Sequence, residues 1–184
     1  MKQVKFLMAV AGFSALSMMG TAQSDSMTIS SSSFKDGEEI PQRLAGTGAD
    51  CGDGDAMSPA VKWADLPQGT QSIAVVLFDP DGGKGQGVVH WVAYNIPATR
   101  EGFKEGEAPK SMDNVTIGMN SADAEAYRGL CPPAGDSPHH YVLTVIATEK
   151  HPGNLPAGLD RAGLLNAIKD HSLAAQSIVG RYGH

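Results

Sequence analysis

The stretch SIAVVLFDPDGGKGQGVVHWVAYN, residues 72–95, decides the fold class. It contains two short apolar runs, 72–78 and 88–95, which are rich in β-branched residues and separated by a loop of proline and glycine. Such runs are typical of β-strands. A third run of this kind lies at 141–148, and SIVGRY at 177–182 can form a last strand. The sequence therefore predicts a mainly β fold.

One helical segment is expected near the C-terminal end. Leu159, Leu164, Leu165 and Ile168 recur at near-helical spacing, and Asp160 stands in the first turn. The chain shows no internal repeat and no long linker. We therefore expect one domain, whose helix packs on a sheet or serves a dimer contact.

The first 22 residues have the form of a secretory signal peptide. Two lysines open the chain, an apolar stretch follows, and small residues at 20–22 offer a cleavage site. A membrane anchor is the alternative, but the stretch is short and contains glycine and serine. We expect a leader at 1–22, a single domain at 23–184, and a periplasmic or secreted location.

Charge and cysteine content fit an exported protein. Removing residues 1–22 takes away two lysines and no acid, so the formal net charge changes from −6 to −8. An acidic domain argues against binding to nucleic acid or to anionic membranes, although one pocket can still bind an anion. Cys51 and Cys131 are the two cysteines. In an exported chain an even count favours a disulfide, and two buried free thiols are the alternative.

The glycine-rich loop at 82–87 matches no nucleotide-binding motif. Its glycines do not fit G-x-G-x-x-G, and Lys84 is followed by glycine where a Walker loop needs Ser or Thr. The GDGD at 52–55 lacks the later glutamate and the flanking helices of an EF-hand. We therefore interpret 82–87 as a flexible connection and predict no cofactor.

The residues that flank this loop are the first candidates for chemistry. Simple alternation places Asp79 on one face with Leu77, at the end of the first strand. It places His90 on a face with Val92 and Tyr94 in the second strand. If the strands pair, Asp79 can orient the imidazole of His90 and favour its charged form. A satisfied core histidine is the alternative for His90.

A second group lies in YRGLCPPAGDSPHHY, residues 127–141. Pro132, Pro133 and Gly135 make a stiff loop, and His139 and Tyr141 begin the next strand on a common face. This arrangement predicts either a small polar site or an ordinary surface turn. His140 falls on the opposite face.

Together, these residues resemble the phosphatidylethanolamine-binding protein (PEBP) family, also called Raf-kinase-inhibitor-like proteins, and above all its bacterial branch. The shared motifs cover nearly the whole of 23–184 in the family's order. They are DPD at 79–81, HW at 90–91, CPPAG at 131–135 with His139 and Tyr141 after it, SPAVKW at 58–63, FKDG at 34–37 and NIP at 95–97.

The resemblance implies a PEBP-like antiparallel β-sandwich with a small anion pocket near one end. The pocket would bind phosphate or a phosphorylated head group without catalysis. By matched position, its wall would comprise Asp79, Asp81, His90, Tyr127, Pro132, Pro133, His139 and Tyr141. The sequence departs from the family after Asp81, where Gly82-Gly83 replaces the usual Ala-Pro. A protonated His90 or His139 would donate to the anion, so we expect tighter binding at mildly acidic pH.

Three rival interpretations remain. His90, His139 and Asp79 match the residue types of a two-histidine, one-carboxylate metal site. Ser137 lies near His139 but lacks the G-x-S-x-G context of a hydrolase. The family also includes inhibitors of kinases and proteases, so a protein-interaction module is the main alternative. Trp63 and Trp91 are expected in the core.

Overall fold

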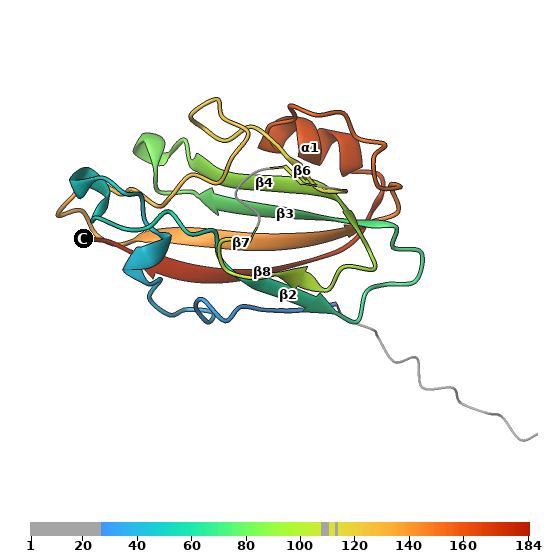
Figure 1. Ribbon diagram of the computed structural model, residues 1–184, viewed down its shortest axis with the longest axis horizontal. Coiled ribbons are helices and arrows are strands. Elements are labelled where there is room, and N and C mark those ends of the chain that lie inside the picture. The colour runs from blue at the N-terminus through green and yellow to red at the C-terminus, as the bar shows by residue number, and fades with distance from the viewer. Residues whose placement is uncertain (1–26, 108–110, 113) are drawn as a thin grey trace, which may run out of the picture.

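The computed structural model describes residues 27–107, 111–112 and 114–184, so the expected leader at 1–22 lies outside the described residues. Within them the fold is mainly β, as predicted, and forms two antiparallel sheets (Figure 1). The strand order is β6-β4-β3-β7-β8 in the large sheet and β1-β2-β5 in the small one. The large-sheet strands are β3 (Ser72–Asp79), β4 (Val88–Pro97), β6 (Thr116–Ile117), β7 (His139–Thr148) and β8 (Ser172–Tyr182). The small-sheet strands are β1 (Thr28–Ser30), β2 (Val61–Ala64) and β5 (Gly102–Phe103).

The short helices lie outside the two sheets. The α-helix α1 (Arg161–Ile168) confirms the predicted C-terminal helical segment. Its N-cap is Asp160, whose carboxylate accepts a hydrogen bond from the Gly163 N–H at 2.7 Å. Single 3₁₀ turns form η1 (Gln42–Leu44), η2 (Ala49–Cys51) and η3 (Gly83–Gly85). No helix in the described part of the chain is long and apolar enough to cross a membrane.

The main core lies between the inner face of the large sheet and the small sheet, which contributes Val61, Trp63 and Phe103. Leu77 of β3 and Leu143 of β7 belong to it, together with both tryptophans, Trp63 and Trp91, which are buried as predicted. The outer face of β3 and β4 packs against α1. Val76 of β3 belongs to a second apolar cluster there, together with Leu164 and Ile168 of α1. Since consecutive strand residues point to opposite faces, the continuous apolar runs of β3 and β4 are explained by burial on both sides.

A β-bulge in β4 changes the face on which His90 lies. Leu77 pairs with Trp91, but the next residue, Phe78, pairs with Val89, so His90 is the extra residue of β4. A bulge of this kind re-aims the side chains around it. The ring of His90 therefore packs against Tyr141 on the inner face.

The predicted common face for His90, Val92 and Tyr94 was therefore wrong. Val92 and Tyr94 pack in the cluster under α1, on the opposite side of the sheet from His90. Simple alternation failed because the sequence alone does not mark the extra residue in β4.

Candidate functional site

A cavity of about 350 Å³ opens where β3 ends and where β4 and β7 begin. Five of the eight predicted site residues line it. They are Asp79, Asp81, His90, Pro133 and His139. The topology explains their meeting, because β3 lies between β4 and β7 in the sheet and is antiparallel to both.

The other three predicted residues stand behind the cavity wall. Tyr127 is buried in the main core, and its hydroxyl donates to the carbonyl of Leu44 at 2.7 Å. Tyr141 is fully buried, and its ring contacts that of His90 edge-on, with 5.3 Å between centroids. The carbonyl of Pro132 accepts from Nε2 of His184 at 3.1 Å. These residues support the site without lining it.

Three charged residues on the wall were not among the predicted site residues. Lys84, Arg128 and Asp136 line the cavity, together with Gly82. The interpretation of 82–87 as only a connection was therefore wrong in this respect. The glycine is needed because an added Cβ at Gly82 would stand 2.8 Å from Oδ2 of Asp79.

Asp79 is buried and accepts several hydrogen bonds. Its Oδ1 accepts from the N–H groups of Asp81 and Gly82, each at 2.9 Å. Its Oδ2 accepts from Nδ1 of His139 at 2.8 Å. The predicted role of Asp79 in orienting a histidine therefore holds, but the partner is His139 rather than His90.

A second aspartate–histidine pair lies beside the first. Oδ2 of Asp81 accepts both the backbone N–H of His140, at 2.8 Å, and its Nδ1, at 2.9 Å. These two hydrogen bonds hold the pKa of the Asp81 carboxyl below its usual range. Asp81 is therefore an ionised acceptor at neutral pH.

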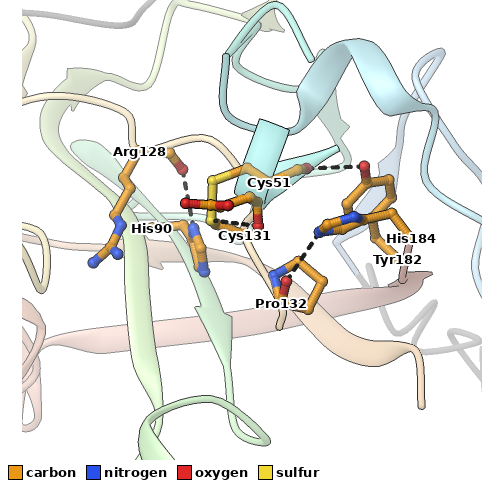
Figure 2. Close-up of a disulfide and its surroundings, with 8 residues drawn as sticks. Cys51, His90, Arg128, Cys131, Pro132, Tyr182 and His184 are labelled. Carbon is orange, nitrogen blue, oxygen red and sulfur yellow. Dashed lines mark hydrogen bonds between the residues drawn. A yellow bond between two sulfur atoms is a disulfide. The ribbon is translucent and has the colours of Figure 1, made fainter. Parts of the chain in front are cut away.

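His90 is 2% exposed and is fixed by the backbone of Arg128. Its Nδ1 forms a hydrogen bond with the Arg128 carbonyl (Figure 2), with 3.0 Å between the two atoms, and its own carbonyl accepts the Arg128 N–H at 2.8 Å. Burial lowers the pKa of His90 from 6.5 to about 4, although the Arg128 carbonyl and the Asp79 carboxylate act in the opposite direction. This low pKa disfavours the expected role of a protonated His90 as the donor to an anion at mildly acidic pH.

Two polar atoms in this region are buried without a hydrogen-bond partner among the described residues. They are Nε2 of His90 and the hydroxyl of Tyr141. A buried polar atom without a partner costs free energy, so such atoms in a native protein call for an explanation. A ligand in the cavity that His90 lines would supply a partner for its Nε2.

A disulfide lies beside the cavity. Cys51 and Cys131 are bonded, which confirms the predicted bridge, and Cys131 lines the cavity (Figure 2). The hydroxyl of Tyr182 donates to the carbonyl of Cys51 at 3.1 Å. The Gly135 N–H donates to the carbonyl of His184 at 3.0 Å. The end of the chain therefore supports the loop that carries Cys131.

Within the described ranges, no three His, Cys, Asp or Glu side chains are grouped so as to hold a metal ion. The three residues weighed as a metal site instead have separate partners. His139 binds Asp79, and His90 binds a backbone carbonyl.

A two-sheet antiparallel sandwich with a small cavity at one end is typical of a ligand-binding protein. The family model described as "Phosphatidylethanolamine-binding protein" matches residues 30–183. The chain belongs to this family.

Relatives of this chain carry the description UPF0098. The protein from Aquifex aeolicus is 34% identical over 157 residues, which cover 85% of this chain and 88% of the relative. YbcL from Escherichia coli is 36% identical over 140 residues, which cover 72% of this chain and 75% of YbcL. Their descriptions assign no catalytic activity.

Solved structures have the same fold. The crystal structure of Escherichia coli YbcL, described as a member of the mammalian PEBP family, matches with a TM-score of 0.77 at 29% identity and covers 86% of this chain and 98% of that one. A PEBP homologue from Chlamydia trachomatis matches with a TM-score of 0.74 at 24% identity and covers 88% and 99%, which supports the fold alone. The predicted family and the predicted PEBP-like sandwich are both confirmed.

Proposed function

We propose that this chain binds a small oxyanion, such as phosphate or a phosphorylated head group, in the cavity at the end of β3, without converting it. The observation that carries the proposal is the buried, unpartnered Nε2 of His90, a residue that lines a cavity of about 350 Å³. This volume lies at the lower end of the usual range for ligand pockets, roughly 300–1,000 Å³. A small polar group therefore fits better than acyl chains.

The charges of the wall support a partly protonated or zwitterionic ligand. Lys84 and Arg128 supply cationic donors, and three aspartates, Asp79, Asp81 and Asp136, line the same space. An ammonium group beside the phosphoryl group would pair with such carboxylates. The name of the matching family, phosphatidylethanolamine-binding protein, refers to a head group that combines an ammonium and a phosphoryl group.

The hydrogen bonds of the site favour binding over catalysis. Ser137 and His139 line a neighbouring groove, but no hydrogen bond joins them among the described side chains. A serine nucleophile needs a base within hydrogen-bond reach, although apo structures can show it loosely placed. The Asp79–His139 pair is better understood as an oriented ligand contact.

The disulfide supports the proposal that the protein works outside the cytoplasm. A bond between Cys51 and Cys131 persists in oxidising compartments and is rare in the cytosol. An exported protein would meet free phosphorylated compounds or membrane head groups, and not a cytosolic kinase. We therefore place the ligand in the periplasm or the external medium.

Calorimetric titration with phosphate and with phosphoethanolamine tests the proposal. Saturable binding to the wild type should be lost or strongly weakened in His90→Ala. The matched control is His171→Ala, because His171 is partly exposed and pairs with Glu149 at the opposite end of β7 and β8. Absence of binding to the folded wild type would reject the anion site and favour the alternative role as a protein-interaction module.

A further inference from the structure

The hydrogen bond of His90 determines the tautomer of its ring. The carbonyl oxygen of Arg128 can only accept a hydrogen bond, so Nδ1 of His90 must be the protonated donor (Figure 2). The two atoms lie 3.0 Å apart. A neutral imidazole has a single N–H group. Nε2 therefore has a lone pair, and it is the buried atom without a partner in the described structure.

The environment of His90 keeps its imidazole ring neutral. Its ring is 2% exposed, and burial lowers its pKa to about 4. The backbone carbonyls of Arg128 and Gly129 and the Asp79 carboxylate favour the charged form, but burial outweighs them and the charge of the Arg128 guanidinium acts in the same direction as burial. The other titratable groups on the wall are Asp81, Lys84, Asp136 and His139. Between pH 5 and pH 8 the buried wall thus offers an acceptor where an anion-binding site would ordinarily offer a donor.

The carboxylates add further acceptors to the same wall. Both oxygens of Asp79 already accept hydrogen bonds, and Asp81 is held in its ionised form by His140. A fully deprotonated oxyanion would place its own lone pairs against those of His90 and the carboxylates. An oxyanion that keeps one hydroxyl group avoids this conflict, because the hydroxyl can donate to Nε2.

We propose that the cavity selects oxyanions that still carry a hydroxyl group, namely inorganic phosphate and singly ionised phosphomonoesters, over sulfate and phosphodiesters. The inference rests on the proposed function and specifies its ligand. The favoured ligand is a free phosphate or monoester, and not the diester group of an intact phospholipid. Lys84 and Arg128 neutralise the remaining charge of the ligand.

Four ligands test the proposal by calorimetry at pH 5.5 and pH 8. Inorganic phosphate keeps a hydroxyl at both values, while phosphoethanolamine, as a phosphomonoester, loses its own above a pKa of about 6. Sulfate and glycerophosphoethanolamine have no acidic hydroxyl at either pH. Sulfate is a dianion at both pH values, so its binding reports any change in the charge of the protein itself.

The expected result is a ranking that follows the hydroxyl group. Phosphate should bind at both pH values, and phosphoethanolamine should weaken at least about 10-fold from pH 5.5 to pH 8. Sulfate and glycerophosphoethanolamine should bind at least about 10-fold more weakly than phosphate, which is the usual penalty for an unsatisfied buried acceptor.

A variant reverses the role of the key atom. In His90→Gln the amide nitrogen can take the place of Nε2 and donate, so the preference for phosphate over sulfate should shrink toward parity. His171→Gln, outside the cavity, should keep the preference of the wild type. If His90→Gln does not fold, nitrogen NMR of the wild type gives the tautomer directly, and a proton on Nε2 would overturn the proposal.

The outcomes separate the two proposals. Equal binding of phosphate and sulfate, with no pH effect particular to phosphoethanolamine, would overturn the selectivity but leave the anion site in place. No binding of any of the four ligands to the folded protein would overturn both.

Discussion

Removal of the disulfide should lower stability strongly and leave the ligand site intact. Cys51 and Cys131 are 80 residues apart in the sequence, and their bond restricts the unfolded chain more than the folded one. The chain-entropy relation gives about 4.5 kcal/mol at 25 °C for a loop of this length. For a protein of this size that loss corresponds to a drop in Tm of roughly 10–18 °C.

The folded geometry should survive because backbone bonds already hold the two loops together. The Gly46 N–H donates to the carbonyl of Leu130 at 2.8 Å, and the Leu130 N–H donates to the carbonyl of Leu44 at 3.2 Å. The loss of stability is therefore expected to arise in the unfolded state. Phosphate affinity at 20 °C should change by less than about threefold, under 1 kcal/mol.

The assay is urea unfolding of the double variant Cys51→Ala/Cys131→Ala beside the oxidised and the reduced wild type. The reduced wild type is the matched control, since it lacks the bond but keeps both sulfur atoms. It should unfold at the same urea concentration as the double variant. A loss of less than about 1 kcal/mol in both would refute the reasoning, because it would mean that the unfolded chain gains little freedom.

Three further predictions concern single residues. The folded-state pKa of His90 lies below its unfolded value, so the unfolded chain takes up the proton first, and the free energy of unfolding should fall as pH drops from 6.5 to about 4. This contribution, about 3 kcal/mol by pH 4, should be missing from the pH–stability profile of His90→Gln. Glu105 accepts two hydrogen bonds from Arg43, which lower its pKa. Glu105→Gln should therefore cost about 1–2 kcal/mol at pH 7 in urea unfolding, and the difference should vanish in acid as Glu105 itself becomes protonated. Gly87 has φ of +85°, and an added Cβ would collide with the ring of Phe78, so Gly87→Ala should cost more than about 1 kcal/mol, measured by thermal unfolding. An unchanged Tm would contradict this account of the turn before β4.

The sequence predicted the elements of the fold better than their contacts. The strands β3, β4, β7 and β8 and the helix α1 all lie where apolar periodicity and flanking glycine or proline placed them. The pairing order of the sheet was not derivable from periodicity, because pattern alone does not say which strands are neighbours. The family resemblance implied an antiparallel sandwich but no strand order, which comes from the structure.

Some residues of the candidate site were predicted individually from the sequence, and others that line the cavity were not. Asp79 at the end of β3 and His139 at the start of β7 form a hydrogen bond, whereas the prediction had paired Asp79 with His90. Lys84 and Arg128 were not predicted, because Lys84 lies in a loop that matches no nucleotide-binding motif and Arg128 lies between Tyr127 and the CPPAG motif without being a matched position of the family. Their place on the wall depends on how the two loops fold back over the end of β3.

The bulge in β4 explains both the failed face prediction and the proposed selectivity. Without the extra residue, alternation would turn His90 toward α1, away from Asp79 and Tyr141. With it, the backbone and ring of His90 both bind Arg128, the carbonyl accepting and Nδ1 donating. That double contact leaves Nε2 as the free acceptor, since a neutral ring that donates at Nδ1 has no proton left to offer. A local irregularity of one strand thus sets the hydrogen-bonding character of the ligand cavity.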